Sequence, residues 1–359
     1  MLVTNEEEIL IIEEDNKNRK KNKKGKKINR WFYIFIILDV LAIAALFVIY
    51  GPWSGFRDFW ITSAMTTMTH HYLAETFYSD EVIKDVINKN FVENIDATTD
   101  ASEITFSDGK DTGIYESEYE EQILKRDEGN DLYKVFDITV NRSKAHIAVI
   151  YDPSRITYTV SSKINNRGQQ LIDIAREQEA VVAINASAFA RIGSGGRKLV
   201  PNGITIKEGR ILQNGVVASK YGIIGFNNDN VLVLMKGTAE EAIAAGIRDA
   251  MTFGPFLYVN GVPAKINGNG GWGVAPRTVI AQRKDGIAFF IVFDGRSAGG
   301  LGASMNDLIE VLTRYKAYNA ANLDGGGSST LVVNNKVINE TGGWGYTGDR
   351  YLPDAWIVK

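Results

Sequence analysis

The stretch Ile287–Asp324 reads IAFFIVFDGRSAGGLGASMNDLIEVLTRYKAYNAANLD, with two apolar runs on either side of one helical pattern. Its first run, IAFFIVF, is apolar throughout, which is typical of a strand buried on both faces. The pattern SMNDLIEVLTRYKA is that of an amphipathic helix, and Ser304 with Asp307 predicts a capping box at its start. A helical crossover of this kind favours parallel strands. We therefore expect Asp294 and Asp324, which follow the two runs, to lie at one edge of a sheet.

The sequence upstream adds further strands and helices. YKVFDITV, HIAVIY, ITYTVS and VVAI have β-type composition, whereas RGQQLIDIAREQEA and AEEAIAAGIRDA have helical spacing. This mixture predicts an α+β (mixed α/β) fold, a mixed β-sheet domain flanked by helices. VVAI leads into Asn185, so three apolar strands are followed by a polar residue. Each could be an ordinary strand-to-turn residue, but together they indicate a ligand site at the strand ends.

The N-terminal region predicts a membrane anchor. Residues 31–50, WFYIFIILDVLAIAALFVIY, are apolar except for Asp39, and as a helix they would span ~30 Å of hydrocarbon. Lysine and arginine crowd the residues before them, so we expect a cytoplasmic N-terminus and an extracellular C-terminal domain at the cell membrane. A cleaved signal peptide is the alternative, but the apolar run is long for one and no clear small-x-small site follows it.

Composition divides the rest of the chain. Apolar residues at helical spacing predict a helical stalk, and an acidic stretch poor in apolar residues predicts a linker. The predicted parts are a basic cytoplasmic tail (1–30), a transmembrane helix (31–50), a helical stalk (51–91), an acidic linker (92–131) and one large domain (132–359).

Several functions are excluded by composition and spacing. A net charge of -3 gives no indication of a nucleic-acid partner, and the absence of cysteine excludes disulfides and thiolate chemistry. GRSAG at 295–299 fits a nucleophile elbow, but no histidine follows His146, so a serine triad is excluded. GNGGWG at 268–273 leads into VAPRT rather than a helix, so a dinucleotide site is not supported.

Carboxylates, arginines and glycines remain as candidate functional groups. NLDGGGSST surrounds Asp324 with bare backbone, and Arg277 and Arg296 can bind a phosphate with two parallel hydrogen bonds each. Together with Asp294 they suit a substrate that carries a phosphate and a bond cleaved by acid–base chemistry. Surface salt bridges would use the same arginines, and that alternative stays open.

Six blocks of this chain resemble, in order, those of the phosphodiester glycosidase family. They are INASAFA, VPNGITIKEGRIL, FGPFLYVNGV, APRTVIAQ, FDGR and NLDGGGSSTL, and the resemblance covers roughly Lys163–Lys359. The first block departs from the family pattern, because residues 186–188 stand where more glycine and an aromatic pair are usual. The membrane-anchored outline resembles bacterial members often labelled as exopolysaccharide-related.

The resemblance implies a hydrolase that cleaves the bond between a sugar C1 and a phosphate oxygen, acting in cell-surface polysaccharide metabolism. It makes Asp324 and Asp294 the catalytic candidates and gives Arg277 and Arg296 the phosphate. Further substrate contacts would come from Asn185, Gly325, Gly326, Gly327, Ser328 and Ser329. A side chain at Gly326 should obstruct the ligand.

Two alternatives follow from the same residues. A non-catalytic domain could bind or scaffold phosphorylated surface glycans, and turnover of a sugar phosphodiester would distinguish it from an enzyme. No cofactor is required by the sequence, but Asp294 and Asp324 could instead bind calcium or magnesium, which prefer carboxylate oxygens. The expected partners are a sugar phosphodiester and the membrane.

Overall fold

The computed structural model describes residues 30–67, 70–106, 113–218, 220–295, 300, 302–341 and 350–359. The chain separates into two compact units, Met1–Arg57 and Asp58–Lys359.

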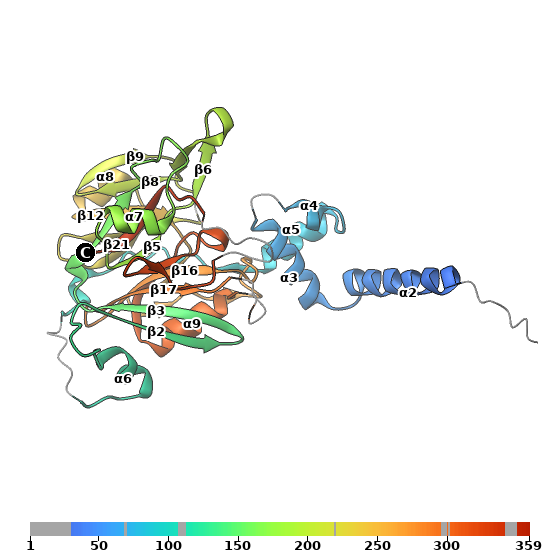
Figure 1. The fold of residues 1–359 in the computed structure, drawn as a ribbon, viewed down its shortest axis with the longest axis horizontal. Coiled ribbons are helices and arrows are strands. Elements are labelled where there is room, and N and C mark those ends of the chain that lie inside the picture. Colours follow the sequence, from blue (N-terminus) through green and yellow to red (C-terminus); the bar gives the residue numbers. More distant parts are fainter. Residues whose placement is uncertain are drawn as a thin grey trace, which may run out of the picture. The chain divides into compact units, whose positions relative to one another are not determined.

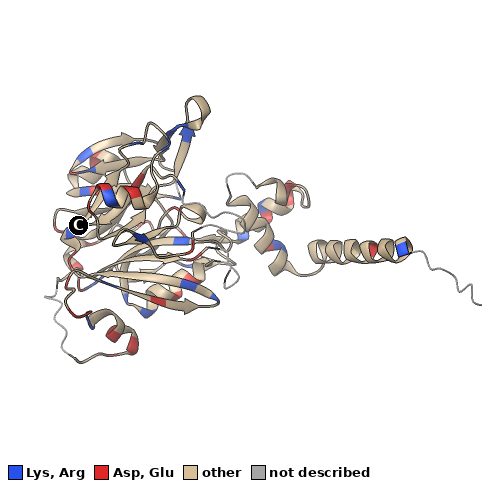
Figure 2. Ribbon diagram, viewed as in Figure 1, with Lys and Arg blue, Asp and Glu red and all other residues tan. Residues whose placement is uncertain are grey.

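The first unit contains helix α2 (Arg30–Tyr50), whose residues are all accessible at the surface. Its 21 residues have a mean hydropathy of 2.8 over the most apolar window, enough to cross a membrane, and no other described helix meets this test. Arg30 and Asp39 are the charged residues of α2, and Figure 2 shows the rest of the helix uncharged. The predicted apolar helix is therefore present. It fits a single-pass anchor or a signal sequence.

The segments predicted as stalk and acidic linker belong to the second unit from Asp58 onward. Ile61, Val86 and Ile123, which lie in these segments, are completely buried. The boundaries at 92 and 132 stay predictions. The helices of this region are α3 (Ser54–Met65), which begins before the division, α4 (Tyr72–Glu75), α5 (Asp80–Lys89) and α6 (Glu118–Leu124).

Three larger sheets and two short ribbons form the second unit, and all pairings among the described strands are antiparallel. The seven-stranded sheet contains, in spatial order, β14 (Val262–Pro263), β13 (Phe256–Val259), β18 (Ala317–Asn322), β16 (Arg277–Arg283), β17 (Ala288–Phe293), β3 (Ser143–Ile150) and β2 (Tyr133–Val140). One five-stranded sheet contains β11 (Leu232–Met235), β10 (Gly222–Asn227), β12 (Ile247–Phe253), β8 (Ile204–Lys207) and β9 (Arg210–Asn214). The other contains β20 (Lys336–Val337), β19 (Leu331–Val333), β5 (Val182–Asn185), β21 (Asp354–Val358) and β4 (Ile156–Val160). The ribbons pair β1 (Phe91–Val92) with β15 (Ile266–Asn267) and β6 (Phe189–Ile192) with β7 (Lys198–Pro201).

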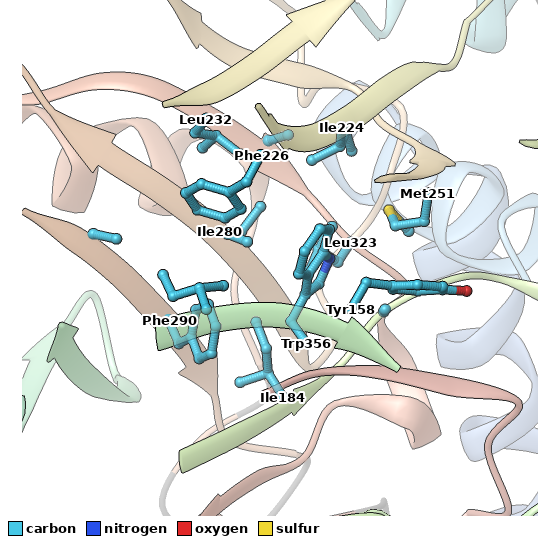
Figure 3. Packing of buried hydrophobic residues seen from close by; sticks show 14 of the residues in the cluster. Tyr158, Ile184, Ile224, Phe226, Leu232, Met251, Ile280, Phe290, Leu323 and Trp356 are labelled. Carbon is cyan, nitrogen blue, oxygen red and sulfur yellow. The ribbon is translucent and has the colours of Figure 1, made fainter. Parts of the chain in front are cut away.

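Each large sheet turns one face to a shared core and the other to a helix. Figure 3 shows the shared core, where the indole of Trp356 packs between rings and aliphatic side chains from different sheets. Its ring centre lies 5.5 Å from that of Tyr158 and 5.7 Å from that of Phe226. The outer faces are covered by α9 (Met305–Arg314), α8 (Ala239–Ala244) and α7 (Leu171–Glu177) respectively, with α9 lying over the seven-stranded sheet (Figure 1).

This arrangement explains why β17 is apolar at every position. Phe290 and Val292 enter the shared core, whereas Phe289 and Ile291 contact the core under α9, because successive side chains of a strand point to opposite faces. The α+β class and the capping box at the start of α9 are both confirmed.

One helical prediction was wrong in part. The segment AEEAIAAGIRDA was expected to be helical throughout, but α8 ends at Ala244 and β12 begins at Ile247. Gly246 between them has a φ of 79°, a left-handed conformation that ends helices. The following residues then pair with β10 instead.

Candidate active site

The two predicted catalytic aspartates follow strands on either side of β16. β16 pairs antiparallel with both β17 and β18, so β17 and β18 run in the same direction, as predicted. Arg277, the first residue of β16, lies opposite Phe293, and the N–H of Leu323 donates to the carbonyl of Thr278. Asp294 and Asp324 therefore both leave the sheet at the end where β16 begins.

The backbone of Asp324 is held from two sides. Its N–H donates to the carbonyl of Ala186 at 3.1 Å, and its carbonyl accepts from Nδ2 of Asn185 at 2.6 Å. Asn185 is 1% exposed and also accepts hydrogen bonds from Thr278 Oγ1 and Thr330 N. Asn185 thus holds the backbone of Asp324 in place, and its contact with a ligand stays a prediction.

Asp324 opens into a cavity of about 930 Å³. Its walls come from segments far apart in the chain. They are the turn after β18, the β6 region, the aromatic side chains of Tyr221, Phe253 and Trp272, and helix α3 with the residues that follow. The lining residues are Ser63, Thr66, Thr67, His70, Ala188, Phe189, Ala190, Arg191, Asn202, Tyr221, Phe253, Trp272, Val274, Ala275, Arg277, Asp324, Gly325, Gly326, Gly327 and Arg350.

The carboxyl group of Asp324 has a pKa above the usual range of an aspartate. Burial raises its pKa to about 6, and the negative charge of Asp354 adds to this. Hydrogen bonds from the Ser328 hydroxyl and the Gly325 N–H, together with the charge of Arg350, lower the pKa and limit the rise. Burial, together with the charge of this carboxylate, also raises the pKa of Tyr221 on the cavity wall. A carboxyl group with this pKa can gain or lose a proton at neutral pH.

Arg277 lines the cavity, but much of its guanidinium holds the backbone. Nη2 donates to the carbonyls of Trp272 at 2.6 Å and Gly273 at 2.9 Å, and Nε donates to Ala303 at 3.2 Å. Its charge lies 5.9 Å from the centre of the Trp272 ring. Arg277 is therefore a structural centre of the site as well as a candidate phosphate ligand. Arg296, its predicted partner, lies outside the described residues.

Besides Arg191, which also lines the cavity, Arg350 supplies a further guanidinium that the sequence did not single out. Its Nη1 donates to Ser328 Oγ at 3.2 Å, its charge lowers the pKa of Asp324, and it lies 4.8 Å above the centre of the Phe189 ring. Phe189 faces the cavity as well. An arginine beside the carboxylate gives the cavity a positive charge suited to a phosphate.

Aromatic rings form a continuous part of the wall. Tyr221 and Phe253 stack with their centres 5.1 Å apart, and Phe253 meets Trp272 edge to face at 6.2 Å. Lys220 lies over two of these rings, 5.2 Å from Tyr221 and 5.7 Å from Trp272. A flat apolar wall next to charged groups is typical of small-molecule sites, where rings bind the apolar face of a ligand.

The three glycines after Asp324 differ in what they require. A side chain at Gly325 would lie 2.9 Å from the carbonyl of Pro276, so this position is too close to β16 for one. Gly326 has a φ of 60°, whereas Gly327 has open space and no such backbone constraint. A side chain at Gly326, which was expected to obstruct a ligand, would therefore also strain the backbone.

The two serines after the glycines are buried. Ser328 Oγ links Arg350 to the carboxylate of Asp324. Ser329 is 1% exposed and does not line the cavity, and no partner for its hydroxyl is found in the described part of the chain. The Ser328 hydroxyl thus lowers the pKa of Asp324 through its hydrogen bond. Ligand contacts from either serine stay predictions.

Asp294 lies in a different environment from Asp324. Its Oδ1 contacts Nε2 of His146 at 2.9 Å and accepts from the N–H of Glu340 at 2.9 Å. The other ring nitrogen of His146 contacts Asp137 at 2.6 Å. Burial opposes charge on His146, but hydrogen bonds and charges of the two aspartates raise its pKa overall. Asp294 does not line the cavity within the described residues, so its catalytic role stays a prediction.

A second buried carboxyl group supports the site. Asp354, at the start of β21, accepts from Tyr158 OH at 2.7 Å and from the N–H of Ser187 at 2.8 Å. Burial raises its pKa to about 6, and it raises the pKa of Asp324 in turn. Asp354 was not identified from the sequence, although an acidic residue directly before the apolar stretch AWIV could have indicated it. No group of three or more His, Cys, Asp or Glu side chains that could hold a metal ion is found among the described residues.

Comparison with known proteins places the chain in a family. The phosphodiester glycosidase family profile matches residues 178–359, about half of the chain. A curated relative, the SPbeta prophage-derived uncharacterized protein YomE of Bacillus subtilis, is 28% identical over 221 residues, which are 58% of this chain. The match spans 33% of that relative, so this chain corresponds to about a third of its length.

Solved structures add a fold match. The zebrafish N-acetylglucosamine-1-phosphodiester alpha-N-acetylglucosaminidase catalytic domain, auto-inhibited by its pro-peptide, matches with a TM-score of 0.52 and 18% identity, covering 65% of this chain and 85% of that one. A hypothetical protein from Synechocystis matches with a TM-score of 0.44 and 18% identity, covering 63% and 62%. With the profile match over half of its length, the chain belongs to the phosphodiester glycosidase family.

Proposed function

We propose that the protein is a hydrolase that cleaves the C1–O bond of a sugar phosphodiester and releases the sugar and a phosphate monoester. The observation that carries this proposal is Asp324, a carboxyl group with a pKa of about 6 that faces the cavity beside Arg350. The family membership and the fold shared with an N-acetylglucosamine phosphodiester glycosidase support the same reaction class.

In this proposal Arg350 and Arg277 hold the phosphate, with bare backbone at Gly327 available to the ligand. A phosphate monoester leaves readily once its charge is neutralised, so little general-acid catalysis is needed at the leaving oxygen. Asp324 acts in its ionised form on the C1 side, either attacking C1 or removing a proton from the attacking water. The bond from C1 to the phosphate oxygen breaks, and water supplies the hydroxyl on C1.

Water labelled with ¹⁸O tests this reaction directly. The purified protein is incubated in labelled water with nucleotide sugars and with methyl phosphodiesters of N-acetylglucosamine in both anomeric forms. Mass spectrometry should find the label in the released sugar, because C1 receives the water oxygen. Label in the phosphate would instead show P–O cleavage. Binding without turnover of any compound would favour the non-catalytic glycan-binding domain.

We further propose that α2 remains as an uncleaved anchor and that the second unit lies outside the cell, acting on cell-envelope polysaccharide. The apolar helix and the lysine-rich residues before it support this orientation. Protease added to intact cells should then digest the second unit. Its survival until the cells are lysed would overturn the proposed topology.

A further inference from the structure

The glycine-rich loop Gly268–Gly273 packs against residues of the segment 58–93, which overlaps the predicted stalk. A side chain at Gly271 would overlap the carbonyl oxygen of Asn90, and one at Gly273 would lie 2.5 Å from the hydroxyl of Ser63. Both contacts are too close for any other residue. The glycines of the GNGGWG pattern therefore leave room for a close approach by residues of the segment 58–93.

Polar contacts fix this approach. Oδ1 of Asn90 accepts from the N–H of Asn269 at 2.8 Å, and Nδ2 of Asn269 donates to Thr62 Oγ1 at 3.0 Å. Asn90 is 4% exposed and also donates to Asp58 and to the carbonyl of Val86. β1 then pairs with β15 just before the loop. The segment is thus held by specific buried hydrogen bonds rather than by apolar contact alone.

The same loop supports Arg277. The carbonyls of Trp272 and Gly273 are the acceptors for its Nη2, and the Trp272 ring lines the cavity. A shift of this loop would therefore move the carbonyl groups that position Arg277.

The segment also forms part of the cavity wall, at Ser63, Thr66, Thr67 and His70. The hydroxyls of Thr66 and Thr67 donate to the helix carbonyls of Thr62 at 3.0 Å and Ala64 at 2.8 Å. A hydroxyl oxygen has two lone pairs, and Thr67 Oγ1 uses one of its own to accept from the N–H of His70 at 2.9 Å. The remaining acceptor capacity of the two oxygens is what sugar hydroxyls require.

We propose that residues 58–67 and 70–93 are an integral part of the ligand site. They hold Arg277 through the Gly268–Gly273 loop, and Thr66 and Thr67 are specificity determinants for the hydroxyl groups of the glycan part of the substrate. This inference rests on the proposed glycosidase function for its substrate class, whereas the positioning of the loop can be tested without any ligand.

Asn90→Ala in the full chain tests the positioning, with Asn88→Ala on the exposed side of α5 as the matched control. Hydrogen exchange at residues 268–275 should become at least tenfold faster in Asn90→Ala and stay at the parent rate in the control. With sugar phosphodiesters as substrates, KM should rise five- to fiftyfold and kcat should change less. Unchanged exchange would overturn the proposal. So would a higher turnover, because it would show that the segment obstructs the site.

The double variant Thr66→Val, Thr67→Val tests the specificity, with exposed Thr76→Val as control. Kinetics and equilibrium binding are measured with UDP-N-acetylglucosamine and its monodeoxy analogues. The parent and the control should discriminate at least tenfold against one analogue, and the double variant should lose this discrimination. Identical preferences in parent and double variant would overturn the specificity role. Absence of turnover in the parent would contradict the proposed function alone, because the exchange and binding measurements still decide this inference.

Discussion

The side-chain amide of Asn185 and the main-chain carbonyl of Asp324 are joined by a hydrogen bond of 2.6 Å. Asn185 ends β5 and Asp324 follows β18, so one buried side chain ties two sheets together beneath the candidate catalytic carboxylate. The polar residue at the end of an apolar strand thus has a structural use here.

Replacing Asn185 with Ala should therefore lower both stability and activity. Three hydrogen bonds are lost, and buried partners at Asp324, Thr278 and Thr330 remain unsatisfied. We expect the free energy of unfolding to fall by about 2–4 kcal/mol. Urea unfolding measures this, with the exposed Asn228→Ala as control. A parental unfolding curve would contradict the role of Asn185 as a brace.

The pH dependence of kcat/KM should follow the titration of Asp324. Burial raises its pKa to about 6, so a carboxylate that acts when ionised gives a rate that rises with pH and levels above about pH 6. Asp324→Asn should remove nearly all activity and the rising limb with it. A rate that falls as pH increases through 6 would assign Asp324 the role of general acid instead.

The stability of the parent relative to Asp324→Asn should depend on pH. The folded-state pKa of Asp324 lies above the unfolded value, so the native state binds this proton more tightly. The stability that the bound proton contributes is complete below about pH 4 and is lost as pH rises through 6. Between these values the variant should gain stability relative to the parent, by at most roughly 2–3 kcal/mol. Chemical denaturation at several pH values measures the difference. A stability difference that does not change with pH would show that burial does not shift the pKa of Asp324.

Gly327→Ala and Gly326→Ala should separate ligand contact from backbone strain. Gly327 has open space, so its variant should keep parental stability and raise KM. Gly326 has a φ of 60°, so its variant should lose about 1–2 kcal/mol of stability. Thermal unfolding and kinetics are measured on both. If Gly327→Ala binds substrate like the parent, the ligand does not lie against this turn.

Arg350 and Arg277 should respond differently to replacement by lysine, which keeps the charge but loses the planar fork. Arg350→Lys should weaken substrate binding by about 1–3 kcal/mol and lower stability less than Arg277→Lys, because its Nη1 donates to a side-chain hydroxyl, that of Ser328, beside the carboxylate. Arg277→Lys should lower stability as well, because three backbone carbonyls lose their donor. Calorimetry and kinetics distinguish the two. An equal loss of stability in Arg350→Lys and Arg277→Lys would contradict the larger structural role of Arg277.

Much of the fold follows from local patterns. β17 and α9 were predictable because hydrophobic spacing and a capping box are encoded within a few residues. The helical spacing of the predicted stalk (51–91) was also visible. Its docking was not, because the contact of Asn90 with Asn269 joins residues 179 positions apart.

The site was predictable only where the chain itself concentrates the signal. Asp324 stands among glycines and was found, whereas Arg350 and Phe189 come together only in the folded chain. Asp294 looked equivalent to Asp324 in sequence. The structure separates them, because His146, 148 residues away, contacts the carboxylate of Asp294.

The position of β21 has a consequence for how the chain is made. It lies between β4 and β5, and pairs with both, although it follows them far downstream. Until the ribosome has added residues 354–358, β4 and β5 each have an open edge with unpaired backbone groups. A nascent chain of this protein is therefore exposed to wrong strand pairing until β21 has emerged, and holdase chaperones should bind it most strongly before that point.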